Sequence, residues 1–147
     1  MTEIKKDDLF YVCSLIEFIG RKTKNKRKEV VNALGEQGII KQLYDAQVNH
    51  CLSFEQVSEE LIEKYQIPHG NFDTISDCKY KVPSFTAIGK LYSHMILDCS
   101  KNGEEIKELI KIYNSFISDE ISDFKTGIYY ENPSYLEHSY QEGVLLA

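Results

Sequence analysis

The chain has 147 residues, of which 42% are hydrophobic and 27% are charged, and its formal net charge at pH 7 is −6. This composition is typical of one soluble globular domain, and it excludes a disordered chain. A membrane protein is also excluded, because no apolar run approaches the ~18 residues of a membrane helix. The amino terminus shows no apolar signal segment, so we expect a cytoplasmic protein. Fifteen lysines and only two arginines, with abundant Ile, Asn and Tyr, suggest a bacterial or phage origin.

The first 65 residues show helical hydrophobic periodicity in short pieces. Four helices are expected here, starting at Asp7 or Asp8, at Asn25, near Ile39 and after Ser53. We expect Gly35 and Gly38 to separate the second helix from the third, because glycine commonly ends helices. The helix after Ser53 has the spacing of a capping box.

The second half shows longer periodic stretches. One helix is predicted from Phe85 to Cys99, with Ser84 as its cap and Asn102-Gly103 as its end. A second is predicted from Ile106 to Phe124 as one continuous apolar stripe. A short terminal helix is expected with Asn132 as its cap and Pro133 as its first residue.

No window alternates with period two, so we predict an all-α fold. We expect a compact bundle of about six to seven helices in two packed subdomains, residues 1–65 and 84–147. Residues 66–83 form the crossover between them, and structureless loops above ~12–15 residues are usually functional or linking segments. Neither half is large enough to be robust alone, so the halves are expected to pack together.

The strongest charge signal is the octet 21–28, which carries +6 while the other 139 residues carry −12. Its cations are Arg21, Lys22, Lys24, Lys26, Arg27 and Lys28. If Asn25 caps the next helix, cations in its first turn oppose the helix dipole at ~0.3–1 kcal/mol each, and a bound anion would compensate for them. Three interpretations remain: a solvated loop paired with the acidic body, a protein-binding surface, or a nucleic-acid site. The acidic remainder disfavours nucleic acid.

A second group of candidate binding residues lies near the carboxyl end. It consists of Tyr129, Tyr130, Tyr135 and Tyr140, followed by the apolar segment 144–147. Tyrosine is enriched at binding hot spots, but these rings could equally cover the core of the second half. The sequence therefore predicts either core packing or a surface for a homodimer or another partner.

Signals for chemistry are weak. No catalytic motif is present, and we expect no catalytic residue, no metal site and no cofactor. His94 and Asp98 share a helix face, yet no second ligand pair at helical spacing accompanies them. Cys13, Cys51, Cys78 and Cys99 lack zinc-ligand spacing and are expected to be free thiols. The crossover contains His69, Asp73, Asp77 and Cys78, which an enzyme or a small-ligand pocket could use.

The first 65 residues also resemble a known family. The resemblance is carried by Phe10, Val12, Ile16-Glu17, Glu29-Val30, Leu34, Gly38-Ile39, Leu43-Tyr44-Asp45 and His50. They resemble a family of short uncharacterised bacterial helical domains whose genes often lie beside ADP-ribosyltransferase-like genes. The resemblance implies a helical fold and partners in toxin–antitoxin or defence systems, and it assigns no catalytic residue. The second half resembles nothing that we can place.

These observations favour a non-catalytic protein-interaction module of the antitoxin, immunity or phage anti-defence type. Two alternatives remain open. The first is a nucleic-acid-binding regulator that uses the octet, and the second is an enzyme or small-ligand binder built on residues 66–83. We expect a protein partner or a homo-oligomer, and no membrane association.

Overall fold

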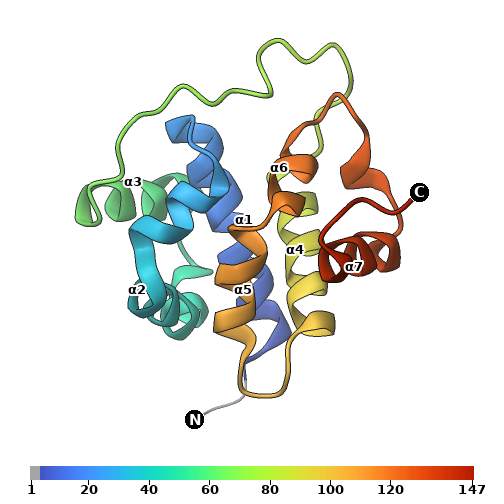
Figure 1. Ribbon diagram of the computed structural model, residues 1–147. Helices are drawn as coiled ribbons and strands as arrows, with labels where there is room; N and C mark the ends of the chain where they lie inside the picture. Colours follow the sequence, from blue (N-terminus) through green and yellow to red (C-terminus); the bar gives the residue numbers. More distant parts are fainter. Residues whose placement is uncertain (1–3) are drawn as a thin grey trace.

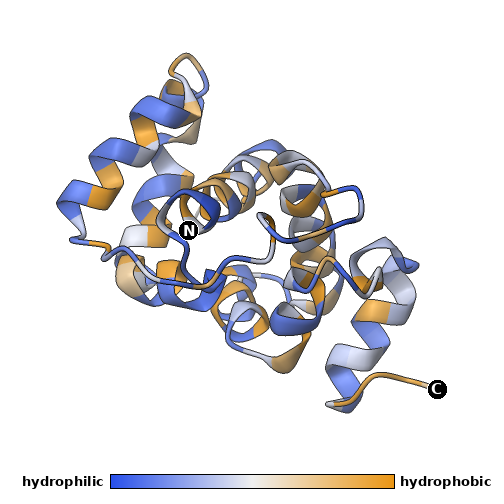
Figure 2. Cartoon of the chain, turned by 90° about the horizontal axis from the view of Figure 1, so that it is seen from above, coloured by the Kyte–Doolittle hydropathy of each residue, from blue (hydrophilic) through white to orange (hydrophobic). Residues whose placement is uncertain are grey.

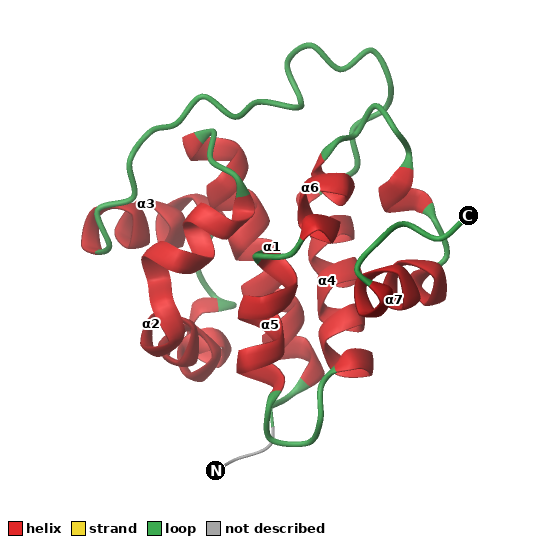
Figure 3. Ribbon diagram, viewed as in Figure 1, coloured by secondary structure: helices red, strands yellow, loops and turns green. Residues whose placement is uncertain are grey.

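The computed structural model describes residues 4–147, which form seven α-helices, a short 3-10 helix and no strand (Figures 1 and 3). The helices are α1 (Lys6–Thr23), α2 (Arg27–Asn49), α3 (Phe54–Lys64), α4 (Phe85–Cys99), α5 (Glu105–Tyr113), α6 (Phe116–Ser122), η1 (Ile128–Tyr130) and α7 (Pro133–Glu142). The predicted all-α class is confirmed. None of the helices in this described part is both long and apolar enough to span a bilayer.

The core lies around α1 and α4, which pack against each other more extensively than any other helix pair. Helices α2 and α5 cover one side of this pair, and α7 packs on α4 (Figure 1). Figure 2 shows hydrophobic and hydrophilic segments alternating along the helices. One continuous hydrophobic cluster includes residues from both halves. Helices α1 and α4 belong to different predicted halves and share this core. The boundaries proposed for two subdomains stay a prediction.

The crossover 66–83 passes over the top of the bundle from α3 to α4 (Figure 1). Backbone hydrogen bonds attach it to the end of α1, from Gly70 N to Thr23 O and from Phe72 N to Lys24 O, each 2.8 Å long. The buried Asn25 side chain adds a bond of 2.7 Å from its Nδ2 to Pro68 O. These bonds hold the crossover beside the α1–α2 turn.

Three predicted helix caps are confirmed. Ser53, Ser84 and Asn132 each accept a hydrogen bond from a backbone amide in the first turn of the following helix. The expected caps Asp7 or Asp8 and Asn25 are wrong, because α1 and α2 begin without a side-chain cap. Asp8 instead accepts a bond of 3.0 Å from Gln47, and Asn25 binds the crossover. Both side chains therefore form tertiary hydrogen bonds and do not cap a helix.

The boundary expected near Gly35 is present as a kink that separates two helical pieces of α2. Residues 27–49 form one helix, interrupted at Gly35 with φ 69° and ψ 176°. Such angles are accessible almost only to glycine, so Gly35 leaves the helical conformation and the chain changes direction here. Gly38 is helical, and its missing side chain leaves room for the ring of Tyr65.

The continuous helix expected over 106–124 is wrong, because residues 114–115 break it into α5 and α6. Asn114 Nδ2 donates to Ile110 O at 2.8 Å, and Ser115 Oγ donates to Ile112 O at 2.7 Å. Such side-chain bonds compete with the helical backbone pattern. Asn114 is also held by a mutual amide pair with Asn32 of α2. The break lets both apolar stripes reach the core.

Candidate functional site

The two arginines of the octet share one carboxylate in the interior. Arg27 Nε and Nη2 donate to Glu17 at 2.8 and 2.9 Å, and both side chains are 2% exposed. Arg21 Nε donates to the same carboxylate at 2.8 Å, and its Nη2 donates to Pro83 O at 2.8 Å. Arg27 is therefore a core residue, and it is too deeply buried to serve as the surface contact that the sequence predicted.

The lysines of the octet point to different acidic partners. Lys22 pairs with Glu55 and lies 3.5 Å from Glu59, while Lys24 lies 3.9 Å from Asp73 and Lys26 lies 3.8 Å from Asp119. Among residues 4–147 only Lys28 of the six cations has no acidic partner within 4 Å. Five of the six cations thus have an acidic partner within the chain, with the two arginines sharing one carboxylate, as the paired-loop interpretation expects.

Glu17 is ionised in the folded protein despite its position. Burial raises the pKa of a carboxyl group, but the charges and hydrogen bonds of Arg27 and Arg21 outweigh burial and hold the pKa of Glu17 below its usual value. The two arginines therefore stabilise a buried anion, and this is their visible role in the fold.

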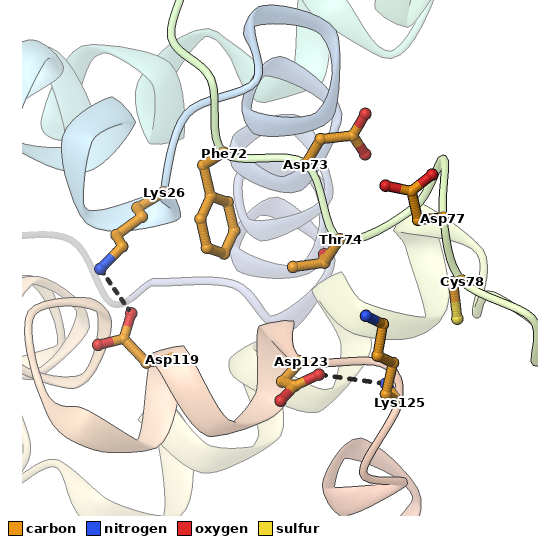
Figure 4. A pocket seen from close by; sticks show the side chains of 9 residues that line it. All are labelled: Lys26, Phe72, Asp73, Thr74, Asp77, Cys78, Asp119, Asp123 and Lys125. Carbon is orange, nitrogen blue, oxygen red and sulfur yellow. Dashed lines mark hydrogen bonds and ion pairs between the residues drawn. The ribbon is translucent and has the colours of Figure 1, made fainter.

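The crossover forms one wall of a pocket of about 410 Å³ above α6 (Figure 4). It is lined by Lys26, Phe72, Asp73, Thr74, Asp77, Cys78, Asp119, Asp123 and Lys125. Lys26 Nζ lies 3.8 Å from Asp119 and 5.8 Å from the centre of the Phe72 ring. Three of the four crossover residues named from the sequence line this pocket. The fourth, His69, lies elsewhere, with its Nδ1 3.0 Å from Thr23 O.

The most constrained carboxylate of this pocket is unsuited to proton transfer. Asp73 accepts hydrogen bonds from the Ser76 hydroxyl and from the amides of Ser76 and Ile75. These bonds lower the pKa of Asp73 to about 2. The group stays anionic at neutral pH, so it can attract a cation but cannot act as a general base.

An apolar groove of about 420 Å³ runs along the start of α4. Its walls are Lys81, Pro83, Ser84, Ala87, Ile88, Leu91, Tyr129 and Tyr130. The Tyr129 hydroxyl donates to Lys81 O at 3.3 Å, and its ring packs edge-on against Phe124 and Tyr130. Tyr130 is 86% exposed at the edge of the groove. This groove is an aromatic surface that no other part of residues 4–147 covers.

The other two tyrosines serve internal packing. Tyr140 is buried, and its hydroxyl donates to Glu108. The Tyr135 hydroxyl donates to Leu146 O at 2.9 Å, which holds the carboxyl-terminal segment against α7. The tyrosine group thus divides, with Tyr129 and Tyr130 at the groove and Tyr135 and Tyr140 against the bundle.

The four cysteines are free thiols. Cys13 is buried, which raises its pKa to about 12, and Cys51 is exposed.

Sequence reasoning missed the apolar half of the groove, because Ile88 and Leu91 follow the ordinary pattern of core residues. It also missed Glu137 of α7, which lies beside His94, since no local spacing connects the two residues.

Comparison with family models, with curated proteins and with solved structures found no match to this chain. The family resemblance of residues 1–65, and the cytoplasmic location, stay predictions.

Proposed function

We propose that this chain is a non-catalytic protein-interaction module of the antitoxin, immunity or phage anti-defence type, which acts by occupying a partner protein. The groove beside α4 carries the proposal. Tyr130 is 86% exposed, and beside it the groove is lined by exposed Ala87 and half-buried Leu91, with buried Ile88 beneath them. Exposed tyrosines beside apolar pockets are typical of binding hot spots.

Charge indicates the chemistry of the partner. The formal net charge is −6, and five of the six octet cations are already paired within the chain. The acidic excess is therefore available at the surface, and it favours a basic partner through steering and complementarity. The partner surface that fits best carries an apolar side chain for the groove, surrounded by Lys and Arg.

Site-specific crosslinking tests the proposal. A photo-crosslinking amino acid replaces Tyr130 in the native host, and the matched control replaces Tyr44, which is 85% exposed on α2 and lies outside the groove. We expect a crosslink from position 130 to one basic protein, with none from position 44. A second copy of this chain at position 130 would indicate a homodimer instead.

Purified components then measure the contact. Tyr130→Ala should weaken the complex by at least about 30-fold, the effect of a hot-spot residue worth ~2 kcal/mol. Tyr44→Ala should leave the affinity unchanged. Equal effects of the two substitutions, or crosslinks to nucleic acid alone, would contradict the proposal.

The nucleic-acid alternative receives less support from the geometry. Arg27 is buried, and only Lys28 of the octet lacks an acidic partner among the described residues. A nucleic-acid surface needs several cations free to contact phosphates. Titration of labelled DNA and RNA against salt, with Lys24 and Lys28 changed to Ser, tests this alternative directly.

The crossover pocket favours a second candidate function, the binding of a small organic cation. Four aspartates and the Phe72 ring line the pocket, against two lysines. A ligand ammonium group would compete with Lys26 for Asp119 and for the face of Phe72. Thermal-shift measurements with diamines and polyamines test this candidate. A shift in the wild type that Asp119→Asn and Phe72→Leu abolish would support it.

A further inference from the structure

Three side chains able to bind metal meet between α4 and α7, and none of them lines the groove or the crossover pocket. His94 and Asp98 lie one turn apart on α4, and Glu137 comes from α7. His94 Nε2 lies 3.1 Å from Asp98 Oδ2 and 3.8 Å from Glu137 Oε1. One donor atom from each residue lies within 4.8 Å of the others. We infer that His94, Asp98 and Glu137 bind one divalent transition-metal ion, with Zn²⁺ as the favoured ion.

The spacing of the donor atoms fits a single ion. Zinc binds His nitrogen and carboxylate oxygen at about 2.0–2.2 Å, so tetrahedral ligand atoms lie about 3.3–3.6 Å apart. The two distances from His94 Nε2, 3.1 and 3.8 Å, lie on either side of this range. The third pair of donor atoms, on Asp98 and Glu137, lies within 4.8 Å, so coordination of one ion requires these side chains to draw together.

Glu137 supplies an independent observation. The Oε1 atom of its carboxyl group is inaccessible to solvent, and no protein group donates a hydrogen bond to it. The nearest cation-forming group is the His94 ring at 3.8 Å, beyond hydrogen-bond distance. A buried carboxylate oxygen without a partner is costly, and native structures usually satisfy such an atom with a donor, a water or an ion. A metal ion at this position would satisfy it.

The other two ligands keep the site accessible. The side chains of His94 and Asp98 are 56% and 47% exposed, whereas that of Glu137 is 14% exposed. An ion can therefore enter from solvent, and water can complete its coordination, as in zinc sites with three protein ligands. A bound ion would link the carboxyl-terminal helix α7 to α4, and it would hold α7 in place through coordination as well as packing.

The test uses the full chain after treatment with a chelator. Calorimetric titration with Zn²⁺ should give one ion per chain, and the same addition should raise the thermal unfolding temperature. His94→Ala and Glu137→Gln should each weaken binding at least about tenfold, the loss caused by removing even an outer partner of a ligand. The matched controls His138→Ala and Glu142→Gln change exposed residues of α7 outside the cluster, and they should bind as the wild type does.

Cobalt distinguishes this site from the cysteines. Co²⁺ held by one imidazole and two carboxylates gives weak visible bands, whereas thiolate ligation adds intense near-ultraviolet absorption. The inference is overturned if the wild type binds no Zn²⁺, if the thiolate band appears, or if His94→Ala and Glu137→Gln bind as the controls do. Circular dichroism of each chelated variant verifies that a loss of binding is not a loss of fold.

Discussion

Glu17 and Arg27 form a bidentate ion pair inside the hydrophobic core, with N–O distances of 2.8 and 2.9 Å and both side chains 2% exposed. The pair joins α1 to the first turn of α2. Removal of Glu17 leaves the buried Arg27 guanidinium without a counter-charge, and removal of Arg27 leaves buried Glu17 with Arg21 as its one remaining cation. Either loss inside the core costs far more than the loss of a surface pair.

Substitution of Arg27 should therefore destabilise the fold strongly. Arg27→Met removes the main partner of buried Glu17, and we expect the free energy of unfolding to fall by about 3–5 kcal/mol. Urea denaturation followed by circular dichroism measures the change. The control Lys28→Met alters the neighbouring cation, which lacks an acidic partner in the described chain, and should stay within about 0.5 kcal/mol. Similar losses in both variants would show that Arg27 has no special role.

The same pair predicts a loss of stability in acid. The pKa of Glu17 is lower in the folded protein than in the unfolded chain, so its contribution is complete at a pH above the unfolded value of about 4.3. The contribution is lost as the pH falls further, through the folded pKa. Urea midpoints between pH 7 and pH 3 measure it. Glu17→Gln cannot titrate, so its midpoint should fall less steeply below pH 4.5. Parallel curves for the two proteins would refute this prediction.

Asn25 should control the order of the crossover. Its side chain is buried and donates to Pro68 O at 2.7 Å and to Thr23 Oγ1 at 2.9 Å. Asn25→Ala leaves these acceptors without a donor, and we expect a loss of about 1–3 kcal/mol. Hydrogen exchange should accelerate in residues 66–83 more than in α4. Asn71→Ala, at an exposed position of the same crossover, is the control and should change neither measurement.

Gly89 sets the distance between α1 and α4. A Cβ atom at this position would lie 2.6 Å from the backbone nitrogen of Ser14, and backbone atoms cannot move aside cheaply. Gly89→Ala should therefore destabilise the fold by about 1–3 kcal/mol, despite the better helix propensity of alanine. Thermal unfolding measures the effect. Lys90→Ala, next in the chain and exposed, should be nearly neutral. A stabilised Gly89→Ala protein would contradict the close packing described here.

Much of the fold could be predicted from local signals. Ser53, Ser84 and Asn132 were recognisable as caps, because a cap and the amides that it binds lie within one turn of sequence. Asp8 and Asn25 have the same chemistry but bind residues 39 and 43 positions away, and so no local rule could assign them. The break at residues 114–115 was missed for a similar reason, since it depends partly on the amide pair of Asn114 with Asn32.

The candidate sites were also predictable only where their residues lie close together in the sequence. The octet was visible as a run of cations, but the environment of each cation depends on Glu17 of α1 and on Glu55, Asp73 and Asp119 from three other segments of the chain. The pair of His94 and Asp98 was visible from helical spacing, whereas Glu137 joins it only because α7 packs on α4.

The sequence by itself determined the helical class, most helix positions and the acidic charge, because periodicity, capping and composition act over a few residues. The tertiary structure decided which charges are exposed, because the burial of an ionic group depends on partners brought together from distant segments. The octet is the clearest case. Its two arginines share the carboxylate of Glu17, while Tyr130, one of four clustered tyrosines that the sequence could assign either to the core or to a surface, is left exposed at the edge of an apolar groove.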